Sequence, residues 1–243
     1  MRTANPVLKS KAFDVSGSYS EPMTINGVVN KSAALLGILI LSAYWIWDKF
    51  YTNMVMGEIS TYMFVGILGG LVVALITTFK PNYSMYTAPL YALLEGLALG
   101  GISAFLEARY PGIVIQAVAL TFATLFSLLA AYRSGLIRVT ENFKLMVTAA
   151  TGGIFIVYML SFVLNLFGTQ IPFIHDSGLI GIIFSLVVVA VAAMNLVLDF
   201  DFIEQGAEKG APKFMEWYAA FGLLVTLVWL YLEILRLLSK SRR

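Results

Sequence analysis

Seven long apolar runs, following one another along the chain, constrain the fold most strongly. A helix needs about 20 apolar residues to cross roughly 30 Å of hydrocarbon, and each run has about that length. Such runs form helices because backbone polar groups in lipid must bond within their own segment. We therefore predict an all-α polytopic membrane protein with seven transmembrane helices at about residues 30–50, 58–79, 87–106, 113–133, 144–167, 178–200 and 216–238.

The composition separates this chain from soluble domains. Hydrophobic residues make up 59% of the 243 residues and charged residues only 12%, whereas soluble domains carry roughly 25% charged residues. The net charge of +2 gives no indication of a nucleic-acid partner. The absence of cysteine excludes disulfides, thiol catalysis and sulfur ligation of metals. The partner that the composition predicts is the lipid bilayer.

Residues 1–27 differ from the rest of the chain because they are polar and contain Pro6, Pro22 and several serines. They lack the apolar core and the small-residue cleavage site of a signal peptide. We interpret residues 1–27 as a mobile cytoplasmic arm and residues 28–243 as one seven-helix transmembrane domain.

Basic residues predict the orientation, because Lys and Arg collect in cytoplasmic loops. The arm and the loops after the second, fourth and sixth spans favour a cytoplasmic N-terminus. The tail argues the other way, since seven full crossings place Arg236, Lys240, Arg242 and Arg243 on the outer side. A re-entrant span would return the tail to the cytoplasm, and this alternative stays open.

Two pairs of glycines, Gly66 with Gly70 and Gly96 with Gly100, lie four residues apart in the second and third spans. Small residues at this spacing let two helix backbones approach closely in a membrane. Close packing of these helices is therefore the expected role of both pairs.

Glu95 lies within the apolar run of the third span. A carboxylate at the centre of a bilayer costs about 3 kcal/mol on insertion scales, so it persists mainly where it faces a partner or a water-filled cavity. Glu95 therefore predicts an intramembrane polar site. The alternative is a neutral, hydrogen-bonded packing group.

The sixth span ends in a polar stretch that contains Asn195, Asp199, Asp201 and Glu204. Asn195 and Asp199 are four apart and share a helix face, whereas Asp201 points elsewhere. Oxygen ligands without cysteine suit protons or hard cations such as calcium better than zinc, copper or iron. The alternative is that Asp199 and Asp201 are solvated charges at the helix end.

With a cytoplasmic N-terminus, Glu95, Asp199 and Glu216 all lie toward the cytoplasmic side of their spans. Carboxylates that share a poorly solvated site cannot all ionise, so they compete for protons. The three residues therefore predict a pH-sensitive latch.

Two further patterns bear on function. Glu233 and Arg236 in the last span are three residues apart, which predicts a local ion pair on one helix face.

The chain has a single histidine and no His-Glu-x-x-His motif or recognisable serine-nucleophile motif. We therefore predict that the protein is not an enzyme and carries no cofactor.

The sixth span ends in Leu-Val-Leu-Asp199-Phe-Asp-Phe-Ile-Glu, and the closing helix reads Leu-Val-Trp-Leu-Tyr-Leu-Glu-Ile-Leu-Arg-Leu-Leu. With the seven-span pattern, these segments resemble the Bax inhibitor family. The opening Met-Arg-Thr-Ala-Asn-Pro-Val-Leu is similar to the bacterial YccA-like branch. The resemblance implies a bacterial inner-membrane protein whose last helix is central in the bundle. It also implies that the protein lets calcium leak through the membrane in a pH-dependent way.

The resemblance also implies a site. In relatives, an aspartate late in span six pairs with one in span seven, and a basic residue that ends span two contacts the pair. Asp199 matches the first position and Lys80 the basic one, whereas Thr226 stands at the second aspartate. Our own inference is that Glu95 or Glu216 supplies the missing carboxylate, with Asp199 and Glu95 as the calcium ligands.

Three functional hypotheses follow. The first is a pH-responsive calcium leak channel gated by intramembrane carboxylates, with Asp199 opposed by Lys80 when closed. The second is a non-transporting modulator of a membrane-bound AAA protease, in which the protease would bind the polar N-terminal arm. The third is a proton-coupled transporter of small solutes, for which the sequence offers no substrate pocket.

Overall fold

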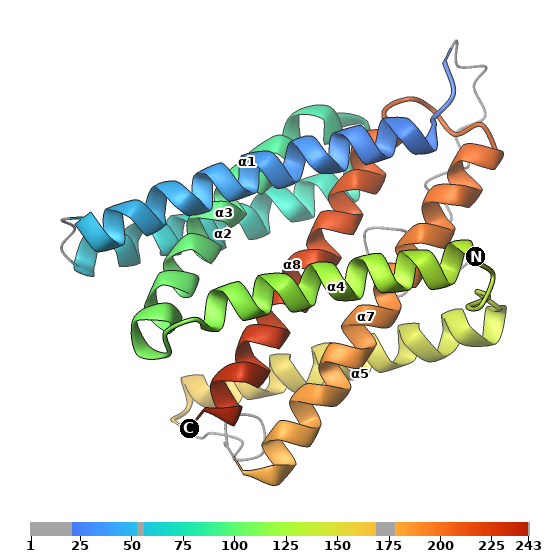
Figure 1. Ribbon diagram of the computed structural model, residues 1–243. Coiled ribbons are helices and arrows are strands. Elements are labelled where there is room, and N and C mark those ends of the chain that lie inside the picture. The colour runs from blue at the N-terminus through green and yellow to red at the C-terminus, as the bar shows by residue number, and fades with distance from the viewer. Residues whose placement is uncertain (1–20, 53–55, 169–177, 243) are drawn as a thin grey trace. The chain divides into compact units, whose positions relative to one another are not determined.

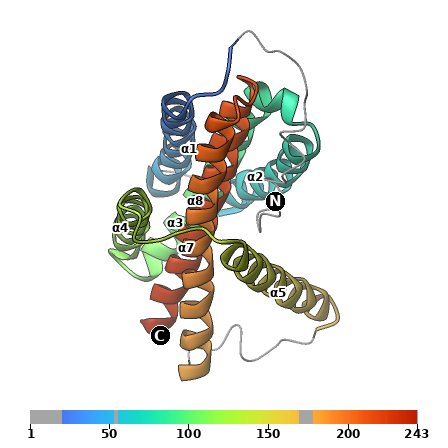
Figure 2. The same ribbon diagram turned by 90° about the vertical axis from the view of Figure 1, so that its right-hand side faces the viewer.

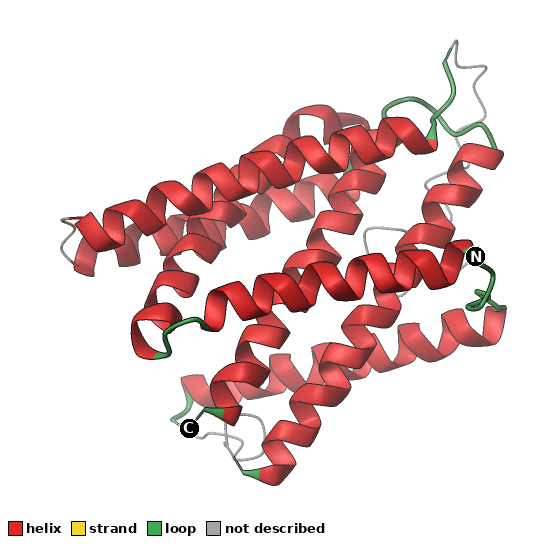
Figure 3. Cartoon of the chain, in the orientation of Figure 1, coloured by secondary structure: helices red, strands yellow, loops and turns green. Residues whose placement is uncertain are grey.

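A computed structural model describes residues 21–52, 56–168 and 178–242, and within them the protein consists of helices and short connections (Figure 3). Seven of these helices are long and apolar enough to cross a membrane. The prediction of an all-α, seven-span fold is therefore confirmed. The helices are α1 (Ile25–Thr52), α2 (Met56–Phe79), α3 (Ser84–Arg109), α4 (Ile113–Arg133), α5 (Glu141–Leu166), α7 (Leu179–Glu208) and α8 (Met215–Ser241).

The helix ends follow local chemistry. The short 3-10 helix η2 (Pro81–Tyr83) separates α2 from α3, since proline cannot continue the preceding helix. Gly112 has a φ of 80°, a left-handed conformation that glycine adopts readily, immediately before α4. The side chain of Thr140 accepts a hydrogen bond from the Phe143 backbone N–H and caps α5.

Two helix ends differ from the predicted spans. α7 continues to Glu208, beyond the predicted end near residue 200. α1 begins at Ile25, so residues 25–27, the last of the predicted arm, already belong to a helix. Residues 1–20 of the predicted arm lie outside the described residues.

The chain divides into two compact units. The α1–α3 unit contains α1, α2 and α3 with residues 202–225, which form the end of α7 and the start of α8. The α4–α5 unit contains α4 and α5 with α7 up to Asp201 and α8 from Thr226 onward. α8 contributes to both units and has the largest buried share of the seven helices, as the resemblance implies for the last helix.

In the α1–α3 unit, α1 and α2 pack against α3 through glycines (Figure 1). A Cβ atom added at Gly66 would lie 2.6 Å from the Leu94 carbonyl oxygen, and one at Gly96 would lie 2.5 Å from the Leu39 carbonyl oxygen. The predicted close packing at the glycine pairs is thus confirmed. Any larger residue there would push two helix backbones apart.

The helix directions in the α1–α3 unit follow from contacts at one end. The Met23 backbone N–H donates to the Ala211 carbonyl at 2.7 Å. The Ser84 hydroxyl donates to the Phe214 carbonyl at 3.1 Å. The first, third and last helices therefore begin at the same end of this unit.

The α4–α5 unit shows the complementary arrangement, with α7 and α8 running in opposite directions (Figures 1 and 2). The ammonium of Lys240, in the last turn of α8, donates to the Ser185 hydroxyl near the start of α7 at 2.8 Å. Arg242 donates to Gln116 near the start of α4 at 2.8 Å. The fourth and sixth spans therefore begin where the last one ends, the alternation expected of seven full crossings. A re-entrant last span does not fit, because α8 is one helix of 27 residues, about 40 Å long.

Candidate functional site

The acidic end of α7 is the first polar cluster of the α4–α5 unit. Asp199 is completely buried, with 0% of its surface exposed, and Asn195 is buried one turn earlier. The alternative that Asp199 is a solvated helix-end charge is therefore wrong. The fifth span supplies Thr151, whose hydroxyl accepts a hydrogen bond from the Asn195 side-chain amide at 2.8 Å.

The orientation of the Asn195 amide is set by its contacts. Its nitrogen also donates to the Val191 carbonyl at 2.8 Å, and a carbonyl can only accept. Its oxygen, which is buried, has no hydrogen-bond partner among the described residues. Such an acceptor favours an added donor, a water or a cation at this position.

Asp201 pairs with a lysine of α5, the same helix that Asn195 contacts. The Lys144 ammonium is 3.0 Å from the Asp201 carboxylate and 3.4 Å from that of Glu141. Lys144 is buried, which sequence reasoning missed. The available signal was a lysine just inside the predicted limits of an apolar span.

Lys80 and Glu95 belong to the other unit, so their predicted proximity to Asp199 stays a prediction. Lys80 is exposed at the end of α2, with its ammonium 6.0 Å from the centre of the Tyr83 ring. Glu95 is half-buried on α3 and faces Gly70 of α2. A Cβ atom added at Gly70 would lie 3.1 Å from the Glu95 carboxylate. Within the described chain, Glu95 forms no ion pair, and no three acidic or histidine side chains come together in a metal-binding group.

Glu216 has a separate set of partners at the start of α8, and it is completely buried. Its carboxylate accepts hydrogen bonds from the backbone N–H and the hydroxyl of Thr24, each at 2.9 Å. It pairs with Lys31 of α1 and lies 3.6 Å from Lys213. These contacts tie the residues before α1 to α8, so this part of the predicted arm is docked. A role for Glu216 in an ion pathway stays a prediction.

Gly27 allows this docking. A Cβ atom at Gly27 would overlap the Glu216 carboxylate, so a larger residue would displace that side chain from its present contacts. The Lys31 ammonium also lies 5.5 Å from the centre of the Trp217 ring, a cation–π distance. The result is an ionic strap, made of Thr24, Lys31, Lys213 and the buried Glu216.

The predicted ion pair of Glu233 and Arg236 is confirmed, with 2.8 Å between nitrogen and oxygen. Tyr158 of α5 completes it, because its hydroxyl lies 3.0 Å from Glu233 and 2.5 Å from Arg236. The Tyr158 ring also packs against Phe184 of α7. Thr226, at the position of the second aspartate, is buried on the same helix as Glu233.

Seven apolar helices with polar side chains buried between them define a polytopic α-helical membrane protein. The sequence model of the family described as Bax inhibitor 1 like matches residues 5–243, nearly the whole chain. The chain belongs to this family of membrane proteins, which is not known for enzymatic activity. No curated protein and no solved structure gives a significant match.

Proposed function

We propose that the protein is a pH-responsive cation leak channel of the bacterial inner membrane, with calcium as the permeant ion and the N-terminus in the cytoplasm. The observation that supports this best is the complete burial of Asp199 in a long helix that is mostly apolar. An intramembrane carboxylate is costly, and proteins keep one mainly where it serves an ion pathway or pairs with another group.

The chemistry of the α7 end favours a hard cation. The Asp199 carboxylate and the Asn195 amide oxygen are the donor types that calcium prefers. This proposal assigns Glu95 on α3 to the same pathway and Lys80 at the end of α2 to its gate. Proton uptake by Asp199 removes its negative charge and so weakens its affinity for the cation, which shifts the balance between closed and open states.

The test is calcium flux into liposomes that contain the purified protein, measured at several pH values. Asp199→Asn is expected to change both the size of the flux and its dependence on pH, and Glu95→Gln to reduce the flux. Glu58→Gln is the matched control, since Glu58 is an exposed carboxylate near the start of α2. Equal flux in all four proteins would remove Asp199 and Glu95 from the pathway.

Absence of flux from the wild-type protein at every pH would refute the channel. The result expected then is capture of a membrane-bound AAA protease by the N-terminal arm. A pull-down from solubilised membranes tests this with residues 1–20 deleted, a truncation that keeps the contacts of Met23 and Thr24.

A further inference from the structure

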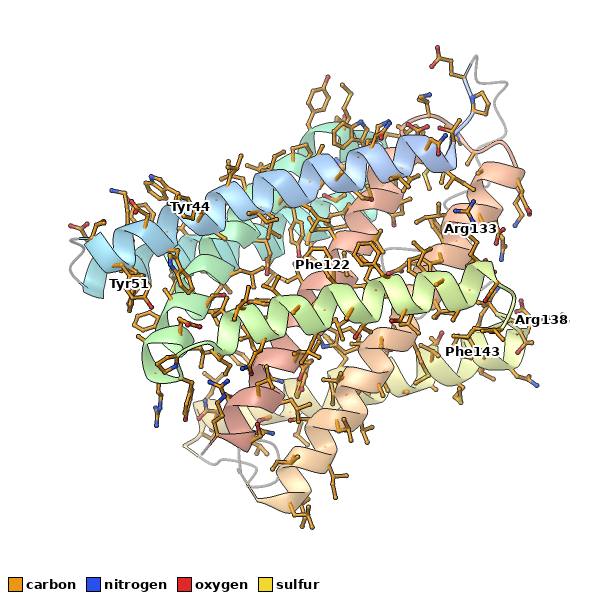
Figure 4. All side chains as sticks on the ribbon, viewed as in Figure 1. Tyr44, Tyr51, Phe122, Arg133, Arg138 and Phe143 are labelled. Atoms are coloured by element: carbon orange, nitrogen blue, oxygen red, sulfur yellow. The ribbon has the colours of Figure 1, made fainter. Side chains whose placement is uncertain are left out.

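Lys144 is unusual because a lysine is rarely buried without a strong partner. Only 5% of its side chain is exposed. In the sequence it follows Phe143, which Figure 4 labels near the start of α5. Of its two carboxylate partners, Glu141 is 75% exposed and Asp201 only 17%. Water screens the pairing with Glu141, so Asp201 is the principal counter-charge.

A second polar contact joins the same two helices. Thr151 lies seven residues beyond Lys144 on α5, and Asn195 lies six residues before Asp201 on α7. Seven and six residues of helix rise by about 10 and 9 Å, so the two contacts are nearly equally spaced on both helices. Because α5 and α7 run in opposite directions, the contacts form two rungs between them.

Asp199 lies between the two rungs. Asn195 is one turn before it and Asp201 two residues after it on the same helix. The ring of Tyr132 from α4 packs on Phe200 in the same interval, with 5.9 Å between ring centres. The backbone that carries Asp199 is therefore held on both sides by neighbouring helices.

We propose that Lys144 and Thr151 are positioning residues that clamp the Asp199 segment of α7 and so set the geometry of the cation pathway. This inference rests on the proposed function, which it deepens by naming the groups that orient the carboxylate. Outer contacts of this kind set the direction of a ligating side chain, and their loss costs on the order of tenfold in cation affinity or activity.

The clamp itself is tested without any flux measurement. The chain has no cysteine, so Thr151→Cys combined with Asn195→Cys is expected to form a disulfide on mild oxidation. Gly152→Cys with Asn195→Cys is the matched control, since a Cβ atom at Gly152 meets nothing within 4 Å. Disulfide formation is measured in detergent as the loss of free thiols that react with maleimide. Equal cross-linking of the two pairs would overturn the clamp.

The functional role is tested by the ratio of calcium to sodium flux in liposomes. Lys144→Met and Thr151→Val are each expected to lower this ratio on the order of tenfold. Lys144→Arg keeps the charge and is expected to retain most of the ratio, which separates positioning from a general loss of folding. Lys209→Met, at an exposed lysine after α7, is expected to leave the ratio unchanged.

The two proposals fail in different ways. If the wild-type protein moves no cations, the proposed function fails, and the cross-linking result still decides the clamp. If the wild type leaks and Asp199→Asn alters the leak, but Lys144→Met and Thr151→Val match the wild type, the positioning role is wrong and the proposed function stands.

Discussion

Replacement of Gly100 by alanine should loosen the packing of α3 on α1. The added Cβ atom would lie 2.4 Å from the Ala43 carbonyl oxygen and 2.9 Å from its Cα, whereas ordinary contact begins at 3.4 Å. Both opposing atoms belong to the backbone, so no side chain can turn away. The two helices must separate locally by about 1 Å, the difference between these distances.

The energetic consequence is large for a single methyl group. A gap of 0.5–1 Å forfeits roughly a quarter to a half of the dispersion energy of the atoms involved. Overpacking a filled interface costs about 1–3 kcal/mol. In lipid, packing and hydrogen bonds replace the hydrophobic effect as the force between helices. We expect the cost of Gly100→Ala at the upper end of that range, about 3 kcal/mol.

The assay is reversible unfolding of the purified protein in mixed micelles by increasing amounts of a denaturing detergent. Gly37→Ala in α1 is the control, because a Cβ atom at Gly37 meets nothing within 4 Å. Its stability is expected to equal that of the wild type. Equal stability of the two variants would refute the close approach of α1 and α3 at Gly100.

Three further outcomes are expected. Glu216→Gln removes the shared counter-charge of the ionic strap and should lower the free energy of unfolding by about 2 kcal/mol, a discounted value for a partly exposed pair. Amide hydrogen exchange at residues 24–31 should become faster, and unchanged exchange would count against the strap. Tyr158→Phe removes the hydroxyl that contacts Glu233 and should cost about 1–2 kcal/mol in thermal unfolding, and a stability equal to the wild type would show that this hydroxyl contributes nothing. Reporters fused to the two ends of the chain should report opposite sides of the membrane, and detection of both on one side would contradict the full crossing by α8.

The two lysines assigned as counter-charges illustrate how far sequence reasoning reached. Lys80 was selected by resemblance because it follows the second span, whereas Lys144 carries no motif and is recognised only by its contact with Asp201. Glu216 is predicted as a pathway carboxylate because it lies toward the cytoplasmic side of the last span, as Glu95 and Asp199 do in theirs. Its partners Lys31 and Thr24 lie 185 and 192 residues away in the chain, beyond the reach of any local pattern.

The class of the protein and its seven helices follow from the amino-acid sequence alone. Each span in lipid must satisfy its own backbone hydrogen bonds, and a run of about 20 apolar residues is enough to identify one. The sequence also predicts contacts within a single turn, such as that of Glu233 with Arg236. Which helix faces meet becomes visible only in the packed fold. In a membrane the lipid-facing and buried faces are both apolar, so the hydrophobic pattern does not reveal helix rotation. The pairing of Lys144 with Asp201 and of Thr151 with Asn195 depends on that rotation and on the register of α5 against α7.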